Sequence, residues 1–365
     1  GTYCAQDFGS GGNLDDQPAS ERLGLYSKFT FKLDDVTEAY LNLNYNQYQT
    51  IFDDAPSQIN APIPVNTNAI ALPPTLISGA INPNDPYSTA ACAPNCPYAI
   101  INYAFGDIPG GTQVFNHNYR MVGGVKGVFA NWDYDSAVVI NHTSLEDTLY
   151  GFINYNQLIT DINNGAYSFI NPASNSAAVR AALAPPLDST STTDMDSIDF
   201  RVNRPLLDLP GGPLGVALGT EYRYEAAKSP SLNPGNAAQG LGQSYINGQH
   251  MVTALYAEMD APVLKSLEAD VAGRYDHYSD FGGSGFIPKL GLKWTPVEEV
   301  AFRGTYSKGF RAPSFAENGS SAVASFNGPV TPPTALIQNK YRAAHQSDAY
   351  LTVPSVLHAP RVSNP

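Results

Sequence analysis

The chain has 365 residues and a formal net charge of −13, with 15% charged and 11% aromatic residues. The acidic balance argues against nucleic acid as a partner, because phosphate backbones are bound by basic surfaces. The charge content is low for a soluble domain, and 31 glycines with 29 prolines indicate many turns, so the composition favours an antiparallel β protein with long loops.

Alternation of apolar and polar residues with a period of two predicts five β-hairpins, and therefore ten strands. In the first strand, Leu23, Leu25, Phe29 and Phe31 lie on one side, and cationic or polar residues lie on the other. Each hairpin has a short turn of about two to four residues. The hairpins pair residues 22–33 with 37–49, 118–130 with 134–150, 196–209 with 214–226, 251–264 with 269–279, and 286–297 with 300–310.

The segments between the hairpins are mostly long, covering residues 50–117, 154–190 and 228–249, and another long segment follows Ala312. Short turns at one edge of a sheet and long loops at the other are typical of outer-membrane β-barrels. Two stretches inside these segments have weak helical patterns and predict short loop helices: residues 154–163 and 176–186.

The lengths of the strands support a membrane protein. They span about 10 to 14 residues, more than the usual five or six and enough for a tilted strand to cross a bilayer. A soluble β-sandwich or solenoid also alternates and is the alternative. The expected fold is therefore all-β: part of a transmembrane antiparallel up-and-down β-barrel of about ten strands, with short periplasmic turns and long extracellular loops.

The same period-two counting gathers ionisable side chains on the face opposite the apolar one. In a membrane barrel they must face the lumen, because an arginine or lysine on the lipid face costs about 2–4 kcal/mol at the midplane. Cross-strand ion pairs that hold the register are one interpretation, and a wall that docks a movable plug or guides a solute is the other. The predicted lumen-facing residues are Glu221, Arg223, Glu225, Glu258, Asp270, Arg274, Lys289 and Arg303.

Cysteines and histidines give few signs of chemistry. Cys92 and Cys96 lie in a loop rich in proline and asparagine and predict a disulfide, whereas a metal site would need further cysteine or histidine nearby. Cys4 is left without an assigned partner. His277 lies beside Asp276 near a predicted strand end, where a solvated histidine is the simplest interpretation. No nucleophile elbow, P-loop, zinc-protease or dinucleotide motif is present, so no catalytic site, metal or cofactor is expected.

Three motifs in the last two hairpins and the segment after them resemble parts of the barrel of TonB-dependent outer-membrane receptors. They are "RYDHYSDFG" at residues 274–282, "PKLGLKWTP" at 288–296 and "RGTYSKGFRAPSFAE" at 303–317. The resemblance implies a barrel of roughly 22 strands around a plug, in the outer membrane of a Gram-negative bacterium. It also implies energy supply by the TonB–ExbB–ExbD complex acting through the plug.

We therefore expect residues 1–365 to be part of one receptor barrel domain, without the plug domain and without the C-terminal closing strands. The expected function is active uptake of a scarce solute, namely a ferric siderophore, a vitamin or an oligosaccharide, and not catalysis. A passive porin-like or adhesin barrel, complete in ten strands, is one alternative. A secreted soluble β protein that binds glycans is another. The sequence does not identify the ligand-binding residues.

Overall fold

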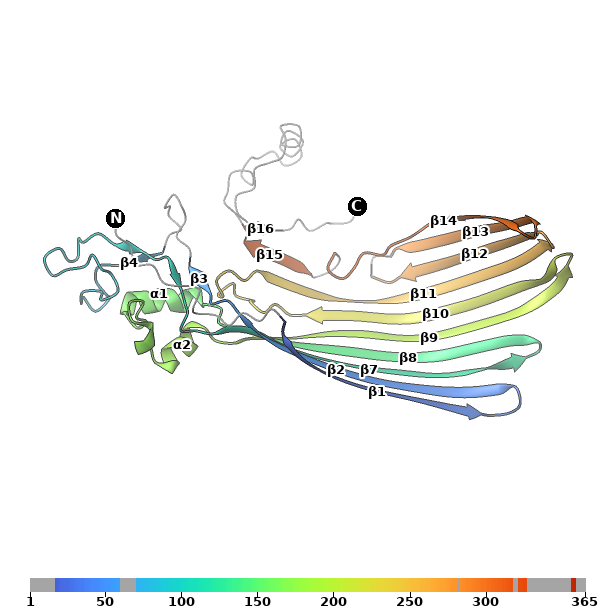
Figure 1. The fold of residues 1–365 in the computed structure, drawn as a ribbon, viewed down its shortest axis with the longest axis horizontal. Helices are drawn as coiled ribbons and strands as arrows, with labels where there is room; N and C mark the ends of the chain where they lie inside the picture. The colour runs from blue at the N-terminus through green and yellow to red at the C-terminus, as the bar shows by residue number, and fades with distance from the viewer. Residues whose placement is uncertain (1–16, 60–69, 281, 318–320, 327–355, 359–365) are drawn as a thin grey trace, which may run out of the picture.

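The computed structural model describes residues 17–59, 70–280, 282–317, 321–326 and 356–358. Ten long antiparallel strands form one sheet in which neighbours along the chain are also neighbours in space (Figure 1). The strands are β1 (Ala19–Lys32), β2 (Thr37–Asp54), β7 (Gly110–Phe129), β8 (Trp132–Tyr150), β9 (Leu187–Leu209), β10 (Gly212–Ser229), β11 (Gln243–Leu264), β12 (Leu267–Tyr278), β13 (Ser284–Val297) and β14 (Val300–Ser307). The ten predicted strands are confirmed, and several are longer than predicted.

The five short turns lie together at one end of the sheet, which we call the turn end (Figure 1). The turn between β7 and β8 consists of Ala130 and Asn131, both with positive φ angles of 51° and 62°. Such two-residue turns match the twist of the paired strands. This turn comes slightly earlier than the sequence pattern indicated. At the end of the sheet opposite the turns, the short strand β15 (Ala322–Phe326) pairs with the first residues of β11 and with β16 (Val356–His358).

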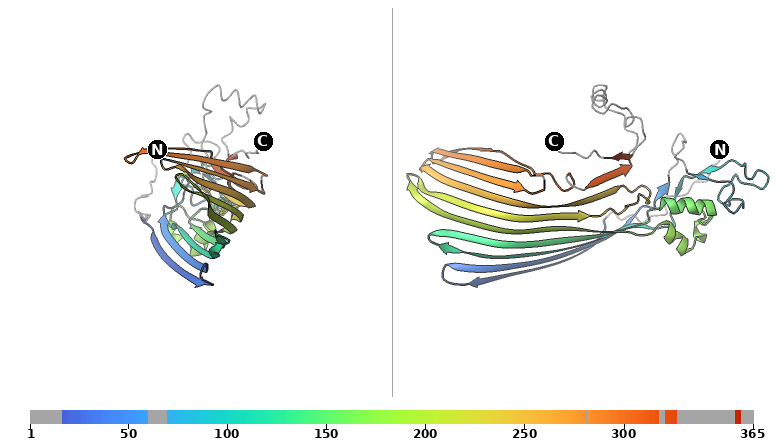
Figure 2. Two further views of the ribbon diagram at one scale, coloured as in Figure 1. Left: turned by 90° about the vertical axis from the view of Figure 1, so that its right-hand side faces the viewer. Right: turned by 180° about the vertical axis from the view of Figure 1, so that it is seen from behind.

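The two faces of the sheet have the reverse of the exposure found in a soluble protein. On the apolar face, Phe29, Leu43 and Phe302 are 45%, 39% and 57% exposed, whereas Val252 and Ala254 on the polar face are 1% and 0% exposed. Seen along the strands, the sheet is curved (Figure 2, left). Side chains of the polar face are less exposed than those of the apolar face, which places the polar face on the inside of the curve. Within the described residues no helix or second sheet covers the apolar face, which rules out the β-sandwich alternative.

Aromatic residues border the apolar face at both ends. Near the turn end, Trp294 stacks on Phe302 at 5.7 Å between ring centroids, and Trp132 lies under the guanidinium of Arg204. Towards the other end, β8 carries His142 on the same face. From Trp132 to His142 the strand advances about 33 Å, which at a tilt of about 40° spans about 25 Å, the height of the apolar band of an outer-membrane barrel.

At the end opposite the turns, two of the long segments fold together into a small body with its own hydrophobic core, which we call the cap (Figure 1). It consists of residues 55–59, 70–109 and 151–186. Its elements are β3 (Gln58–Ile59), β4 (Ala71–Leu72), β5 (Ala99–Ile100), β6 (Tyr103–Ala104), α1 (Tyr155–Asn164), the 3₁₀ helix η2 (Pro172–Ser174) and α2 (Ala177–Leu183). Both predicted loop helices are present. Among the described residues, no helix is long and apolar enough to cross a membrane.

Buried polar side chains hold the two segments of the cap together. The amide of Asn84 donates to the carbonyl of Tyr167 at 2.9 Å and accepts from the N–H of Phe169 at 2.9 Å. The Tyr167 hydroxyl donates to Asp107 at 2.5 Å, and burial together with this bond raises its pKa. Because Asn84 and Asp107 of one segment are bonded to Tyr167 and Phe169 of the other, these contacts favour one arrangement of the two loops.

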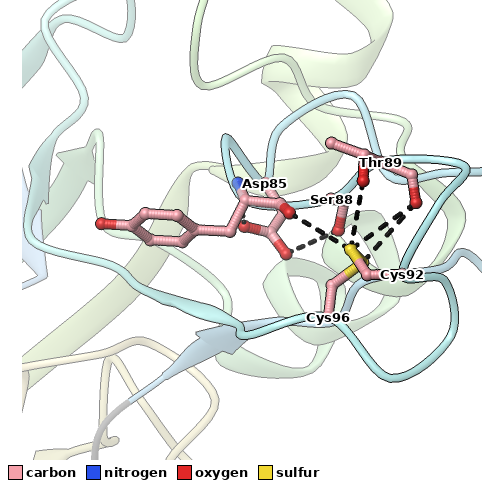
Figure 3. Close-up of a disulfide and its surroundings, with 6 residues drawn as sticks. Asp85, Ser88, Thr89, Cys92 and Cys96 are labelled. Carbon is pink, nitrogen blue, oxygen red and sulfur yellow. Dashed lines mark hydrogen bonds between the residues drawn. A yellow bond between two sulfur atoms is a disulfide. The ribbon is translucent and has the colours of Figure 1, made fainter.

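The structure joins Cys92 to Cys96 by a disulfide within the cap (Figure 3). The loop that carries it is shaped by Asp85, whose carboxylate accepts hydrogen bonds from the N–H of Tyr87 and the hydroxyl of Ser88 at 3.1 and 2.7 Å. Cys4, the third cysteine, lies outside the described residues.

Candidate functional site

The antiparallel register places all eight predicted charged residues on the polar face. Residues directly opposite each other in neighbouring strands share a face, so a residue can be followed from strand to strand. Glu221 lies opposite Asp199 on β9 and Ala254 on β11, and Ala254 lies opposite Asp276 on β12. In the same way, Glu258 and Lys289 both lie opposite Ala272.

Six residues of β10, β11 and β12, together with Asp280 just beyond the end of β12, form a continuous network, which we call the ionic ladder. Arg223 pairs with Glu221 and, at 2.7 Å, with Glu225. Arg274 pairs with Glu221 and with Asp276, both at 2.8 Å. The signs therefore alternate along the chain of contacts, and each arginine joins two carboxylates. In order, the ladder runs through Asp276, Arg274, Glu221, Arg223, Glu225, His250 and Asp280.

His250 closes this ladder, and its position is evident only from the tertiary structure. Its side chain is 5% exposed; Nε2 lies 2.7 Å from Glu225, and Nδ1 lies 3.3 Å from Asp280. Neither carboxylate is close to it in sequence, and the sequence therefore suggested no partner for it. His250 lies two and four residues before Val252 and Ala254 on β11, and this spacing places it on the polar face. The spacing is the one sequence feature that could have identified it. His277, by contrast, lies 3.1 Å from the hydroxyl of Ser284.

Two separate ion pairs lie nearer the turn end, and the first joins two of the predicted residues. Lys289 pairs with Asp270 at 2.7 Å, and Lys293 pairs with Glu268 at 2.8 Å. Arg303 lies directly across from Lys293 in the register, and it has no acidic partner among the residues that the structure describes.

A third charged cluster, absent from the predicted set, lies on β2, β7, β8 and β9. Asp135 accepts a hydrogen bond from Tyr40 at 2.9 Å and pairs with Arg201 at 2.6 Å, while Lys126 pairs with Glu38 at 3.1 Å. Glu38, Lys126, Asp135 and Arg201 line a hollow of about 700 Å³ at the turn end of the polar face. The same period-two counting could have found them, had it been continued along those strands. No group suited to hold a metal ion is present among the described residues.

After β14 the chain crosses the polar face as far as β11 instead of continuing as a strand, so the predicted strand end at residue 310 is wrong. We call residues 308–317 the strap. The ring of Phe315 lies 4.7 Å from that of His250 and covers Gly248, where an added Cβ would be 2.5 Å from the ring. The ring of Phe310 covers Gly285 in the same way. Because glycine has no side chain, both rings can lie directly against the backbone of the sheet. This packing holds the strap over the polar face.

The strap is held in its own shape by Glu317. The carboxylate accepts hydrogen bonds from Arg311 at 2.6 Å and from the N–H and hydroxyl of Ser314 at 2.8 and 3.0 Å. These bonds lower the pKa of Glu317 to about 2. Arg311 is therefore joined to an acid within the strap itself. Residues 318–320 and 327–355 of the predicted final loop lie outside the described part of the chain.

A curved up-and-down sheet with an exposed apolar outer face and a charged inner face defines an outer-membrane β-barrel wall. Residues 5–340 match the family described as "TonB dependent receptor-like, beta-barrel". The chain belongs to this family of TonB-dependent receptors, whose members are transporters and not enzymes.

Solved structures of similar fold are receptors and importers. A ferric enterobactin receptor (PfeA) of Pseudomonas aeruginosa is 13% identical with a TM-score of 0.50, and the match covers 88% of this chain and 37% of that one. The siderophore receptor PirA of Acinetobacter baumannii is 12% identical, with a TM-score of 0.48 and coverage of 86% and 37%. The RagAB peptide importer is 11% identical, with a TM-score of 0.43 and coverage of 76% and 30%. The chain thus spans less than two fifths of each. None of the curated proteins matches the sequence.

Proposed function

We propose that this chain forms part of the barrel wall of an outer-membrane importer, with its polar face towards a water-filled lumen. Residues 1–365 belong to one barrel domain in this proposal. The observation that carries it is the reversed exposure of the two faces. Ionisable side chains occupy the enclosed face, and large apolar side chains stand exposed on the other. In water this distribution is unfavourable, whereas in a bilayer it satisfies both faces.

In the whole receptor, the ionic ladder would give the lumen a wall of fixed charges. Both arginines already have two carboxylate partners, so the wall is held in register without a bound solute. The remaining polar groups of this face can dock a movable plug or guide a solute. The plug, and through it the TonB–ExbB–ExbD complex, would act from outside this chain. The solute class that we propose to test first is a ferric siderophore, because a receptor of similar fold is named for ferric enterobactin.

The sidedness can be tested on adjacent residues of one strand. We expect a spin label at Phe302→Cys to collide mainly with oxygen dissolved in the lipid, and a label at Arg303→Cys to collide mainly with a water-soluble nickel complex. Leu43→Cys and Asn44→Cys provide the same matched pair on β2. Equal accessibility within each pair would disprove the barrel-wall assignment.

The transport proposal has its own test. Cells that carry the receptor and are limited for iron should take up a labelled ferric siderophore, and uptake should stop when the proton-motive force is collapsed or TonB is removed. Uptake that continues without energy would favour the passive porin-like alternative. Uptake of peptide or oligosaccharide but not of siderophore would replace the solute class.

A further inference from the structure

The inner wall formed by β1, β2 and β7 can be compared with the ionic ladder, because the register connects the two. Arg120 of β7 lies opposite Asn141 of β8, which lies opposite Met195 of β9. Met195 in turn lies opposite Glu225 of the ionic ladder. Residues that are paired in this way share a face of the sheet. Arg120 is therefore on the polar face, in the same row of paired residues as Glu225.

Three cations on this inner wall have no acidic partner. Arg120 lies opposite Asn44 of β2, and Lys28 of β1 lies one inward residue closer to the turns. Arg22 lies further from the turns, and its guanidinium is 4.9 Å from the ring centroid of Tyr48. All three cations are exposed, and none is paired with a carboxylate among the described residues.

The inward residues around the three cations are neutral. From Arg22 to Lys28 in β1, and at the positions paired with them in β2 and β7, no inward residue is an aspartate or a glutamate. Asparagine fills most of these positions on β2 and β7, and its amide offers N–H donors as well as a carbonyl oxygen. We call this surface the cationic wall. It consists of the three cations together with Asn42, Asn44, Asn46, Asn116 and Asn118.

The ionic ladder has the opposite balance of charge. Its four carboxylates outnumber its two guanidinium groups, and it stays negative even with His250 protonated. Both surfaces lie on the inside of the curve of the sheet (Figure 2, left), so they border the same lumen. A cleft lined by charge of one sign concentrates ions of the other sign. The difference therefore draws an anion towards the cationic wall and away from the ionic ladder.

The cationic wall lies near the outer mouth of the proposed lumen. Asn141, the partner of Arg120, is followed by His142, which marks the end of the apolar band away from the turns. Arg22 lies still closer to the cap, because β1 runs from there towards the turn end. In the proposed orientation, a solute that enters from outside the cell reaches the cationic wall before the part of the lumen near the turns.

We propose that the cationic wall binds a ferric chelate of net negative charge, so that the receptor selects anionic siderophores. The proposal rests on the importer function proposed above and names the solute more closely. Guanidinium and ammonium groups bind carboxylate or catecholate oxygens by charge-assisted hydrogen bonds. The asparagine amides can donate to the oxygens that remain. An uncharged chelate gains the amide bonds only, so net charge is the property that this wall recognises.

Equilibrium binding to the purified whole receptor in detergent tests the proposal without requiring energy or TonB. The probes are two synthetic ferric chelates on the same backbone. Catecholate arms make one complex anionic, and hydroxamate arms leave the other uncharged. We expect the anionic chelate to bind about tenfold more tightly, which is the scale expected from one or two cations acting through water. The spin-label pairs test the orientation and the uptake assay tests transport, so failure of either is distinguishable from failure of this site.

Variants of the cationic wall locate the binding. Lys28→Gln/Arg120→Gln should lose most of the preference for the anionic chelate and keep the affinity for the uncharged one. Lys28→Arg/Arg120→Lys retains both charges and should retain the preference. Arg303→Gln is the matched control, because it removes a cation from the same face near the turn end, and it should also retain the preference.

Equal affinity of the unmodified receptor for the two chelates, or no binding of either, would overturn the proposal. So would an undiminished preference in Lys28→Gln/Arg120→Gln. A loss of preference in Arg303→Gln as large as in the double variant would also overturn it, because the attraction would then arise from the total charge of the lumen and not from the cationic wall.

Discussion

Removing Arg223 from the ionic ladder is the sharpest test of what holds the polar face together. Its side chain is 21% exposed, and those of its partners Glu221 and Glu225 are 19% and 29% exposed. Exposed ion pairs contribute about 0–1 kcal/mol, and breaking a buried pair costs about 3–5 kcal/mol. With two half-enclosed pairs lost, and with Arg274 and His250 still joined to the carboxylates, we expect Arg223→Gln to lower the free energy of unfolding by about 2 kcal/mol.

The assay is thermal or denaturant unfolding of the receptor in detergent at pH 7, at low and high salt. The single variants Arg223→Gln and Glu225→Gln and the double variant together form a double-mutant cycle. From it we expect a coupling energy of about 1 kcal/mol between the two sites. The matched control is Arg303→Gln on the same face, which lies across from Lys293 and should change stability by less than about 0.5 kcal/mol. If Arg223→Gln were as mild as the control, and the coupling near zero, the network would not stabilise the sheet.

Two further predictions concern the strap and the cap. A Cβ at Gly248 would lie 2.5 Å from an aromatic ring of the strap, so Gly248→Val should release residues 308–317 and expose them to protease, whereas Gly304→Val, with nothing within 4 Å, should not; equal cleavage of both variants would contradict the packing. In the cap, burial raises the pKa of Asp161 above its usual value. Ionisation of Asp161 therefore lowers the free energy of unfolding as the pH rises from the usual pKa through the raised one. Asp161→Asn should slow hydrogen exchange in α1 at pH 7 and have little effect near pH 4. The same effect at both pH values would show that the ionised carboxylate of Asp161 does not destabilise the cap.

The strands could be predicted from the sequence because their pairing is local. Each β-hairpin joins neighbouring segments, and a period of two places residues such as Phe302 and Arg303 on opposite faces whatever the rest of the chain does. The positions of the strand ends were less predictable. β14 stops at Ser307, since the packing of Phe310 on Gly285 outweighs continued pairing, and nothing in the local pattern shows that contact.

The sequence predicted which face of the sheet carries the charged residues of the candidate site, but it did not predict which of them contact each other. The parity of Glu221, Arg223 and Glu225 followed from counting along one strand. Their joining to Arg274 and to the enclosed His250 depends on the register between strands, which long loops separate in sequence. The cap shows the same limit: its two helices follow from local patterns, but the bonds between Asn84 and the segment of Tyr167 do not.

By itself the sequence determined which side of each strand is apolar, where the short turns fall, and that the chain resembles a TonB-dependent receptor barrel. These features are encoded by residues close together in the chain, where spacing alone sets the direction of a side chain. The tertiary structure alone decided the ionic ladder, the course of the strap across the polar face and the core of the cap. Each of these depends on contacts between segments that are distant in sequence, and such contacts are settled by packing and register.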